Sequence, residues 1–404
     1  MSLNNFITVK NAIKIIENRK FSFSTEYIPL EKSNRRILSE NIEVLLNVPP
    51  FSRSAMDGYA VRAIDTSNSL PTNPTYLEVV DEIGAGENSK ITLKPFETVK
   101  IATGAPMPSG SDAVIMHENT EESGSEIKII EKVERHQDMA LTGEDLKKGE
   151  VILKKGQILN PNQLALIASA GYSRINVVKK PVVNVINTGN ELVDPTTNLE
   201  PGMIINSNKY ALKGLVEDSL SVPIMSTCAD DLEIMVKQLK SCLKECDVII
   251  TTGGTAISKG DIVVDAVEEL GEILIHGVSI KPGKPFGFGI IDKKPVFMLS
   301  GYPVAAAVQF DIFVRDKLLN MQRINRKIEL LNVKAGSDVR SAPGKYNVIR
   351  AWLNGETVTP IRTKAGINKS ITQSNCYILT DENTGKVQKG EICHVLPYKN
   401  LNIC

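Results

Sequence analysis

The segment DVIITTGGTAISKGDIVVDAVEEL, Asp247 to Leu270, decides the fold of this chain. It begins with a short apolar run, passes through a pair of glycines and continues with apolar residues at helical spacing from Ile262. A buried strand followed by a glycine loop and a helix is typical of parallel sheets covered by helices. Asp261 stands directly before the helical pattern, so we expect it to cap that helix.

The alternation of strand and helix extends in both directions from this segment. We expect further strands at VVNVIN, VPIMSTC and EILIHGVSI, and further helices at residues 207–220 and 231–243. This order predicts a doubly wound parallel α/β domain over residues 181–323. Ligands of such sheets bind beyond the carboxyl ends of the strands, so four loops are expected on one rim: TGNE, CADD, TTGGTAISKGD and LSGYP.

The rest of the chain predicts three smaller pieces. Between residues 51 and 146, short β-like runs are separated by Gly, Pro, Ser and Asn, which indicates an inserted all-β domain. The flanking residues, 1–50 and 147–180, are expected to complete one small discontinuous α/β linker domain. Residues 324–404 return to β runs with glycine turns, which indicates a C-terminal β-barrel. The predicted fold class is therefore multidomain α/β.

Composition argues for a small-molecule partner. The 404 residues contain 47 Lys plus Arg and 47 Asp plus Glu, so no global field favours nucleic acid or an anionic membrane. No apolar run approaches the roughly 20 residues of a membrane span, and the N-terminus resembles no signal peptide, so a cytoplasmic location is expected. Six cysteines are too few for a disulfide framework. Cys242 and Cys246 read as buried or surface thiols rather than metal ligands.

Two features of the wound domain indicate an anion site. Gly253 and Gly254 follow a strand and allow backbone amides to approach a ligand closely, although tight turns use the same residues. The sequence KPGKP places Lys281 and Lys284 around a glycine turn where the next strand begins. Two cations beside a glycine loop suit an oxyanion.

The same rim carries the carboxylates of Glu191, Asp230 and Asp261, which would repel a phosphate unless a cation lay between them. A magnesium ion that bridges phosphate and carboxylates resolves the conflict. The alternative is that Asp230 or Asp231 caps the following helix and Asp261 caps the next one. In the β insert, Asp57 and Thr103 stand on glycine- and proline-containing loops, where ordinary turn chemistry is the competing interpretation.

Seven segments taken in order resemble the MoeA family, which includes the E domain of gephyrin. The resemblance spans nearly the whole chain. It implies a discontinuous first domain, an inserted β domain, a molybdopterin-binding α/β domain and a C-terminal barrel, arranged as a homodimer whose cleft combines two subunits. The segments are SAMDGYAVR, IATGAPMPSGSDAVIMHE, GEDLKKGE, NTGNEL, ITTGGTAISKGD, SIKPGKPFGFG and LSGYPVAA.

The resemblance also implies a reaction. Adenylylated molybdopterin and molybdate, or tungstate, would give the metal-loaded cofactor and AMP, with Mg²⁺ as a cofactor and the pathway's adenylyltransferase as a further partner. By motif match, magnesium and phosphate would be oriented by Glu191, Asp230 and Asp261, and the substrate anion held by Lys281. The partner subunit would close the cleft with Asp57, Thr103 and Asp145. Substrate binding is further assigned to Gly253, Gly254, Lys284, Gly301 and Ser370.

Several positions depart from the family pattern: Asn190, Ala256, Ser258, Gly277, Ser300 and Tyr302. Gly277 stands where a lysine is common, and Tyr302 adds bulk that either narrows the cleft or stacks on a pterin. These departures keep open a second interpretation, a scaffold protein that binds molybdopterin without turnover. A third interpretation is a molybdopterin adenylyltransferase. Such enzymes resemble only the wound domain of this chain, and they lack the β insert and the C-terminal barrel. The sequence does not distinguish molybdate from tungstate.

Overall fold

A computed structural model describes residues 6–21, 24–254, 261–326, 328–361 and 367–398 of the chain. It divides into two compact units. One contains the residues up to Glu26 together with those from Val178 onward, and the other contains Tyr27–Val177. Within the described ranges, no helix combines the length and the apolar character needed to cross a membrane.

The centre of the first unit is a six-stranded sheet with the order β16-β13-β17-β21-β20-β18. Four neighbouring strands are parallel, as predicted, while β20 runs antiparallel to both of its neighbours. The chain leaves β13 toward β16 on one side and then returns to β17 on the other side. The strands are β13 (Val182–Thr188), β16 (Val222–Cys228), β17 (Val248–Thr252), β18 (Glu272–His276), β20 (Gly287–Ile291) and β21 (Lys294–Leu299).

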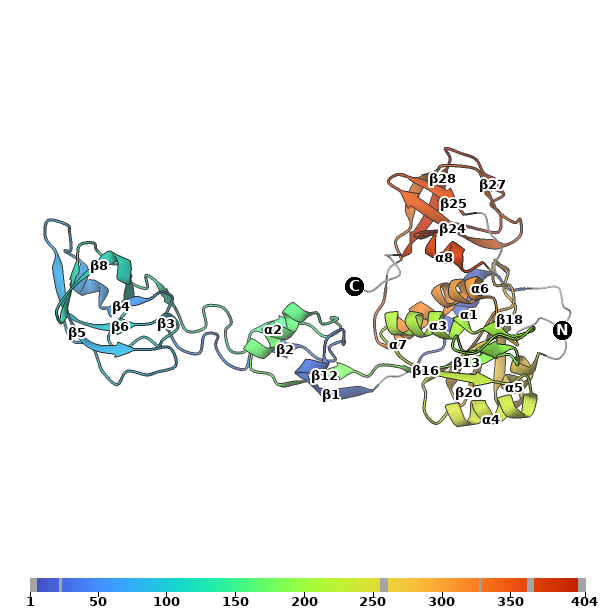
Figure 1. Cartoon of the computed structure of the whole chain (residues 1–404), viewed down its shortest axis with the longest axis horizontal. Coiled ribbons are helices and arrows are strands. Elements are labelled where there is room, and N and C mark those ends of the chain that lie inside the picture. Colours follow the sequence, from blue (N-terminus) through green and yellow to red (C-terminus); the bar gives the residue numbers. More distant parts are fainter. Residues whose placement is uncertain (1–5, 22–23, 255–260, 327, 362–366, 399–404) are drawn as a thin grey trace. The chain divides into compact units, whose positions relative to one another are not determined.

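Helices cover both faces of this sheet (Figure 1). On one face lie α3 (Ser207–Asp218) and α6 (Pro303–Gln309), and on the other lie α4 (Leu232–Cys242) and α5 (Ile262–Leu270). Alternate residues of each strand supply the two apolar cores. Asn206, Asp231 and Asp261 cap α3, α4 and α5 by accepting a hydrogen bond from the backbone three residues on. The doubly wound fold is therefore confirmed.

The N-terminal helix α1 (Val9–Glu17) packs on this wound domain. Its apolar stripe, Val9, Ala12 and Ile16, shares a core with strand residues of the sheet. The ammonium of Lys317 donates to the carbonyl of Ile16 at 2.8 Å. It thereby gives a hydrogen-bond partner to a carbonyl in the last turn of the helix. The first residues thus group with the wound domain, whereas the sequence placed them in the linker domain.

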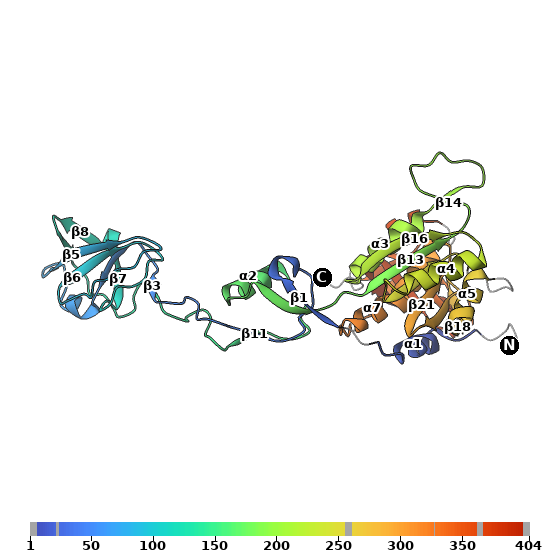
Figure 2. The same cartoon turned by 90° about the horizontal axis from the view of Figure 1, so that it is seen from below.

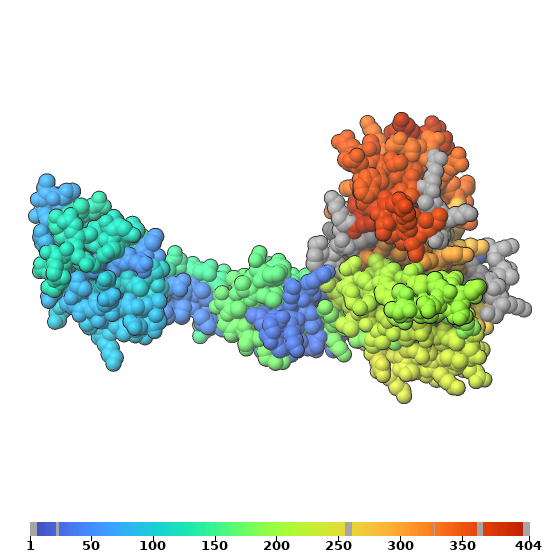
Figure 3. Space-filling model, in the orientation of Figure 1, coloured from blue at the N-terminus to red at the C-terminus, as the bar shows by residue number. Residues whose placement is uncertain are grey.

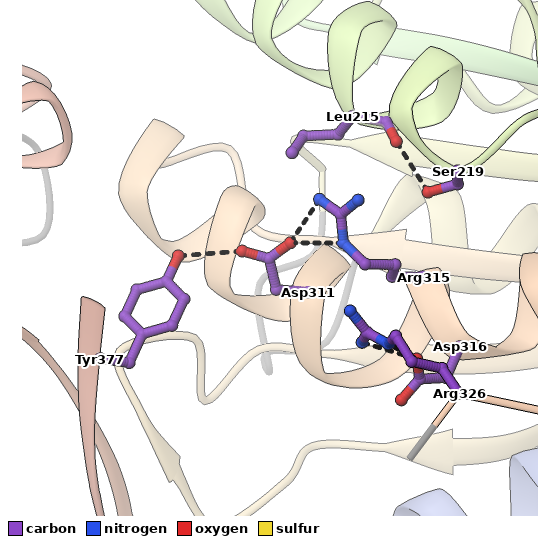
Figure 4. Close-up of polar contacts among 7 residues, drawn as sticks. All are labelled: Leu215, Ser219, Asp311, Arg315, Asp316, Arg326 and Tyr377. Carbon is purple, nitrogen blue, oxygen red and sulfur yellow. Dashed lines mark hydrogen bonds and ion pairs between the residues drawn. The ribbon is translucent and has the colours of Figure 1, made fainter. Parts of the chain in front are cut away.

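The structure divides the helical segment after Tyr302 into two α-helices. Between α6 and α7 (Arg315–Met321), residues Phe310–Val314 form a π-helical turn. The buried carboxylate of Asp311 on this turn accepts hydrogen bonds from Arg315 Nε (3.0 Å) and Nη2 (2.8 Å) and from the Tyr377 hydroxyl (3.0 Å) (Figure 4). Because Tyr377 belongs to the C-terminal domain, this cluster fastens that domain to the wound domain.

The C-terminal domain is a closed five-stranded barrel, as predicted. Its strands pair in the cyclic order β24, β25, β22, β28 and β26, and β19 (Ile280–Lys281) adds to β24. It forms the orange and red lobe beside the yellow-green wound domain in Figure 3. The strands are β22 (Leu331–Ala335), β24 (Tyr346–Asn354), β25 (Thr357–Pro360), β26 (Cys376–Thr380) and β28 (Ile392–Pro397), with β23 (Val339–Arg340), β27 (Lys386–Val387) and the short helix α8 (Lys369–Thr372) outside the ring.

The second unit contains the predicted β insert and a small α/β part. The insert is a six-stranded sheet of order β7-β4-β6-β5-β9-β8, with apolar cores on both faces. Its strands are β4 (Gly58–Val61), β5 (Thr75–Ile83), β6 (Glu97–Ile101), β7 (Ala113–Met116), β8 (Thr120–Ser123) and β9 (Glu126–Ile129), and β3 (Arg53–Ser54) pairs with β10 (Met139–Ala140).

In the small α/β part, α2 (Pro161–Ser169) begins with a capping box between Asn160 and Gln163. Two strand pairs accompany it, β1 (Thr25–Pro29) with β12 (Arg174–Val178) and β2 (Ile42–Glu43) with β11 (Val151–Leu153). Pro161 stands at the first position of the helix, where its missing N–H removes no intrahelical hydrogen bond. Residues on both sides of the insert share one core, so this part is discontinuous in sequence.

Loss of the Asp311 carboxylate would leave the buried Arg315 guanidinium without this partner. We expect Asp311→Ala to lower the free energy of unfolding by about 3–5 kcal/mol in urea titrations. Glu217→Ala is the control, because it removes an exposed pair with Lys213 (3.9 Å) and is expected to cost less than about 0.5 kcal/mol. Equal effects of the two substitutions would contradict a fastening role for the buried cluster.

Candidate active site

The carboxyl ends of the central strands open into a cavity of about 1060 Å³. It lies at the point where the connections from β13 and β17 diverge, which is where doubly wound sheets bind ligands. The four predicted loops contribute to it, so their convergence on one rim is confirmed. The lining residues include Thr188, Gly189, Glu191, Asn208, Asp230, Gly253, Gly254, Asp261, Gly301 and Tyr302.

The glycines of the TTGG loop are required by the backbone. Gly253 has a φ of +90°, and a Cβ atom there would lie 2.4 Å from the carbonyl oxygen of Thr188. Gly254 has a φ of +63°, and its Cβ would lie 2.9 Å from a methyl group of Val263. Only glycine therefore allows the end of β17 to approach β13 this closely. Both glycines and Gly301 line the cavity.

Asp261 combines two roles that the sequence posed as alternatives. Its Oδ1 caps α5 by accepting from the Val264 backbone at 3.3 Å, while its Oδ2 is buried and has no hydrogen-bond partner among the described residues. Burial raises the pKa of this carboxyl to about 6, and the neighbouring Asp265 adds to the shift. The residue is thus both a helix cap and an unsatisfied acceptor in the cavity wall.

The other two acids of the predicted magnesium set are exposed. The Glu191 carboxylate lies against Gly189, within 2.9 Å of the place where a Cβ would stand. The Asp230 backbone donates to Asn190 Oδ1 at 3.2 Å, so Asn190 positions the loop that carries Asp230. In the part of the chain that the structure describes, no three His, Cys, Asp or Glu side chains lie close enough to hold a metal ion. Substrate oxygens and water would have to complete a magnesium site there.

The two predicted lysines are exposed and stand outside the cavity walls, whereas Pro285 of the same loop contributes to them. Lys281 lies on β19 beside the barrel strand β24. The Lys284 ammonium stands 4.2 Å from the centre of the Phe6 ring. Gln309 holds the loop itself by donating to the carbonyls of Gly283 (2.7 Å) and Pro285 (3.1 Å).

Phe6 also explains one departure from the family pattern. Gly277 has a φ of +93°, and a Cβ atom there would lie 2.4 Å from the Phe6 ring. The chain beside Phe6 pairs with the same loop, where Ser279 donates to the Ile7 carbonyl at 2.9 Å. A lysine at position 277 would require a strained left-handed backbone and a displaced Phe6 ring, so glycine suits this position.

The predicted residues of the β insert fall into two places. The Asp57 carboxylate accepts from the Thr103 backbone (2.7 Å) and hydroxyl (2.8 Å), and these two hydrogen bonds lower the pKa of Asp57. The structure thus brings Asp57 and Thr103 together on an exposed surface. Asp145 is exposed on a different segment, where its backbone donates to the Val48 carbonyl at 3.0 Å.

Ser370 is fully buried in the C-terminal domain. Its hydroxyl accepts from Arg350 and donates to the carbonyl of Ile367. These contacts hold the start of α8, and the neighbouring Asn368 is the residue that lines the cavity. Ser370 thus lies behind the cavity wall in this structure.

The sequence analysis missed several cavity residues. Asn208 in the first turn of α3 donates to the Thr252 hydroxyl (3.0 Å) and to the Gly301 carbonyl (2.8 Å), which ties together three segments of the rim. Asn187 and Thr188 end β13 and also line the cavity. The available signal was a change from apolar to polar residues at the ends of two buried strands, VVNVINT and VIITT.

Two further departures, Ser300 and Tyr302, lie at the same rim. Tyr302 precedes α6 with its side chain 65% exposed, and it lines the cavity. The Ser300 backbone donates to Gln309 Oε1 at 2.7 Å. Ala256 and Ser258 lie outside the described residues, as does Cys404. The five described cysteines are buried and unpaired, in agreement with the thiol interpretation.

The wound domain, the switch-point cavity, the β insert and the barrel together define a class: multidomain α/β proteins that bind a small ligand at the carboxyl ends of a parallel sheet. Three family descriptions match successive parts of the chain. They are the MoeA N-terminal region (domain I and II) at residues 7–171, a probable molybdopterin binding domain at residues 184–320 and the MoeA C-terminal region (domain IV) at residues 332–398. The chain belongs to the MoeA family.

Relatives agree over almost the full length. A putative molybdopterin biosynthesis protein of Methanocaldococcus jannaschii is 37% identical, with 97% of this chain and 98% of that protein covered. A molybdopterin molybdenumtransferase of Staphylococcus aureus is 35% identical, with 93% and 91% covered. The crystal structure of a molybdopterin biosynthesis MoeA protein from Pyrococcus horikoshii matches with a TM-score of 0.85 and 32% identity, covering 98% of this chain and 99% of that one.

The contact between Phe6 and Gly277 predicts that an alanine at position 277 costs more stability than an alanine at a glycine with open space around it. We expect Gly277→Ala to lower the free energy of unfolding by about 2–4 kcal/mol, from backbone strain and overpacking together. Gly390→Ala is the matched control, because Gly390 has a φ of +91° and open space around it; only strain of about 1–2 kcal/mol is expected. Adding Phe6→Ala to Gly277→Ala should recover the difference, and no recovery would refute the steric explanation.

The raised pKa of Asp261 predicts a pH-dependent stability. The folded chain holds this proton more tightly than the unfolded chain, so the stabilisation is complete below about pH 4 and is lost as the pH rises through about 6. The stability of wild type relative to Asp261→Asn should therefore fall by up to about 3 kcal/mol over this range, measured by urea unfolding at stepped pH. A constant difference would show that Asp261 titrates normally.

Proposed function

We propose that this protein is a molybdopterin molybdenumtransferase, which inserts molybdate or tungstate into adenylylated molybdopterin and releases AMP. The observation that carries the proposal is the switch-point cavity, with its glycine loop and buried Asp261, in a chain whose whole length matches the MoeA family. Relatives that carry the name molybdopterin molybdenumtransferase support the reaction. A role in molybdenum cofactor biosynthesis follows.

The protein's own task in this reaction is to bind and orient. The phosphoanhydride of the adenylate supplies the driving force, and the two thiolates of molybdopterin supply soft ligands for the metal. The backbone at Gly253 and Gly254 admits the substrate to the cavity, while Lys281 and Lys284 place positive charge on the surface nearby. These groups stabilise the leaving phosphate without taking part in covalent chemistry.

Magnesium suits the acids of this rim, because Mg²⁺ prefers carboxylate oxygens, keeps several waters and binds phosphate at the same time. Glu191 and Asp230 are exposed at the cavity, and the unpartnered Oδ2 of Asp261 stands in its wall. We assign Glu191 and Asp230 as the residues that would hold the ion together with substrate oxygens. Bound there, the ion would neutralise charge on the phosphate.

A homodimer and a composite cleft belong to the same proposal. Asp57 and Thr103 form an exposed acid and hydroxyl pair, which is suited to meet a ligand held elsewhere. We place this pair and Asp145 of one subunit opposite the cavity of the other subunit. The adenylyltransferase that makes the substrate is a suitable further partner, and a cytoplasmic location suits these small-molecule substrates.

The binding-protein alternative rests on the departures from the family pattern. Two of them have structural explanations that do not require loss of activity, since Gly277 accommodates Phe6 and Asn190 supports the backbone of Asp230. Tyr302 remains the departure that alters the cavity itself. Tight substrate binding without AMP release would favour the alternative.

Turnover tests the proposal directly. Purified protein with adenylylated molybdopterin, Mg²⁺ and molybdate or tungstate is expected to release AMP only when an oxyanion is present. Asp261→Ala should lower the rate by at least about 100-fold, as loss of a positioned polar group in an active site does. Ser341→Ala, which removes a half-buried hydrogen bond to the Thr384 carbonyl in the C-terminal domain, is the control that should retain the rate. Bound but intact substrate would contradict the enzyme assignment.

A composite cleft predicts complementation. Asp57→Ala and Asp261→Ala homodimers are each expected to be inactive, because each lacks one half of every cleft. After equal mixing and subunit exchange, half of the dimers contain one subunit of each variant. Each of these mixed dimers has one intact cleft out of two, so about a quarter of the wild-type rate should return. If the mixture stays inactive although exchange is demonstrated by labelled subunits, the two halves of the cleft belong to the same subunit.

A further inference from the structure

The loop that carries Lys281 and Lys284 has a backbone that is fixed without help from its lysine side chains. The side-chain amide of Gln309 donates to the carbonyls of Gly283 (2.7 Å) and Pro285 (3.1 Å). Pro285 lines the cavity, so the residue directly before it, Lys284, stands at the edge of that cavity. The loop is therefore a firm support from which the Lys284 side chain projects.

The Lys284 side chain is exposed, and its ammonium lies on an aromatic ring. The centre of the Phe6 ring is 4.2 Å from the ammonium nitrogen. Within the described part of the chain, no ion pair holds this ammonium. A lysine has a flexible four-carbon stem, and the face of an aromatic ring restricts it by electrostatic attraction. Because an ammonium has three N–H donors, contact with the ring on one side leaves donors for a ligand.

Phe6 owes its position to backbone pairing with the segment after β18. Ile7 forms a parallel bridge with Val278, and the Ser279 backbone donates to the Ile7 carbonyl at 2.9 Å. The helix α1 follows and packs on the wound domain, and Figure 2 shows α1 and β18 at the same edge of that domain. The Phe6 ring is half-buried there. Its place is thus set independently of Lys284.

Gly277 provides the room that the ring needs. A Cβ atom at Gly277 would lie 2.4 Å from the Phe6 ring, so a side chain there would displace the ring. The Gly277 backbone donates to the Phe286 carbonyl (2.8 Å), and the Val278 backbone donates to the Lys284 carbonyl (3.1 Å), which joins the two ends of the loop. One ring therefore lies against the backbone at the start of the loop and against the ammonium near its end.

We infer that Phe6 is a positioning residue for anion binding: its ring holds the Lys284 ammonium at the edge of the cavity, oriented to bind an anionic group of a substrate. The inference rests on the proposed function for the anionic character of the substrates. The anionic group is an oxyanion or a phosphate, both of which present acceptor oxygens to an ammonium. A lysine that is already oriented loses less side-chain freedom on binding, so it binds the anion more tightly. Phe6 acts through Lys284 and makes no contact with the ligand.

Anion affinity tests this inference without requiring turnover. Phe6→Leu keeps an apolar side chain but removes the aromatic face, whereas Phe6→Tyr keeps the face. The full chain is titrated calorimetrically with molybdate and, separately, with AMP. Phe6→Leu should raise the dissociation constant of the anion that Lys284 binds about three- to fivefold, and Phe6→Tyr should retain the wild-type value.

The two titrations also identify the anion. An effect on molybdate alone assigns Lys284 to the oxyanion, and an effect on AMP alone assigns it to the phosphate. If Phe6→Leu leaves both affinities unchanged, or if the wild-type chain binds neither anion, the inference is overturned.

Phe21→Leu is the matched control. The Phe21 ring lies 4.8 Å from the ammonium of Lys317, in the same unit of the structure. Lys317 is buried and donates to the Ile16 carbonyl, so its ammonium is already occupied by the protein. Phe21→Leu removes the same kind of contact and should leave both anion affinities unchanged. A loss equal to that of Phe6→Leu would show a general effect of removing an aromatic ring and would contradict the inference.

A double-mutant cycle separates positioning from packing. In a chain that carries Lys284→Gln, the further change Phe6→Leu should not alter anion affinity, because no ammonium remains to be held. If Phe6→Leu weakens binding by the same factor in both backgrounds, the ring acts through the fold of the loop and the inference fails.

The AMP-release assay distinguishes this failure from failure of the proposed function. A chain that releases AMP, but whose anion affinity does not depend on Phe6, retains the function and loses the inference. A chain whose anion affinity depends on Phe6 through Lys284, but which releases no AMP, retains the inference and loses the function.

Discussion

The close approach of two strand ends is the constraint on which the rest of the site depends. Gly253 stands so near the Thr188 carbonyl that no side chain fits between them. This contact brings the loops after β13 and β17 together at the switch point of the sheet. Because the strands are parallel, the N-terminus of α3 and the cap of α5 open at the same edge. A cavity lined by polar strand ends follows from that geometry.

Several buried polar contacts then hold the surrounding parts in place. Asp311 connects a π-helical turn of the wound domain to Tyr377 of the barrel, and Gln309 fixes the KPGKP loop through two carbonyls. Asn208 ties α3 to two further segments of the rim. The buried Asp311–Arg315 ion pair contributes uniqueness of arrangement more than net stability, because removing charges from water offsets much of their attraction. The contacts of Gln309 and Asn208 bring separate stretches of chain together at the cavity.

Two departures from the family pattern are explained by residues that lie next to them in the folded chain. Gly277 is explained by a phenylalanine some 270 residues earlier in the chain, and Asn190 by the backbone of the next loop. Tyr302 alone adds an exposed aromatic surface to the cavity.

Local patterns in the sequence determined the elements of this protein. Alternating apolar runs, the caps Asn206, Asp231 and Asp261 and the glycines after β17 depend on neighbouring residues, so the wound domain, the insert and the barrel were all predictable. Only the tertiary structure decided that α1 joins the wound domain, that Lys281 and Lys284 stand outside the cavity walls and that Asn208 lines them. Those outcomes depend on contacts between residues distant in sequence, which no local spacing encodes.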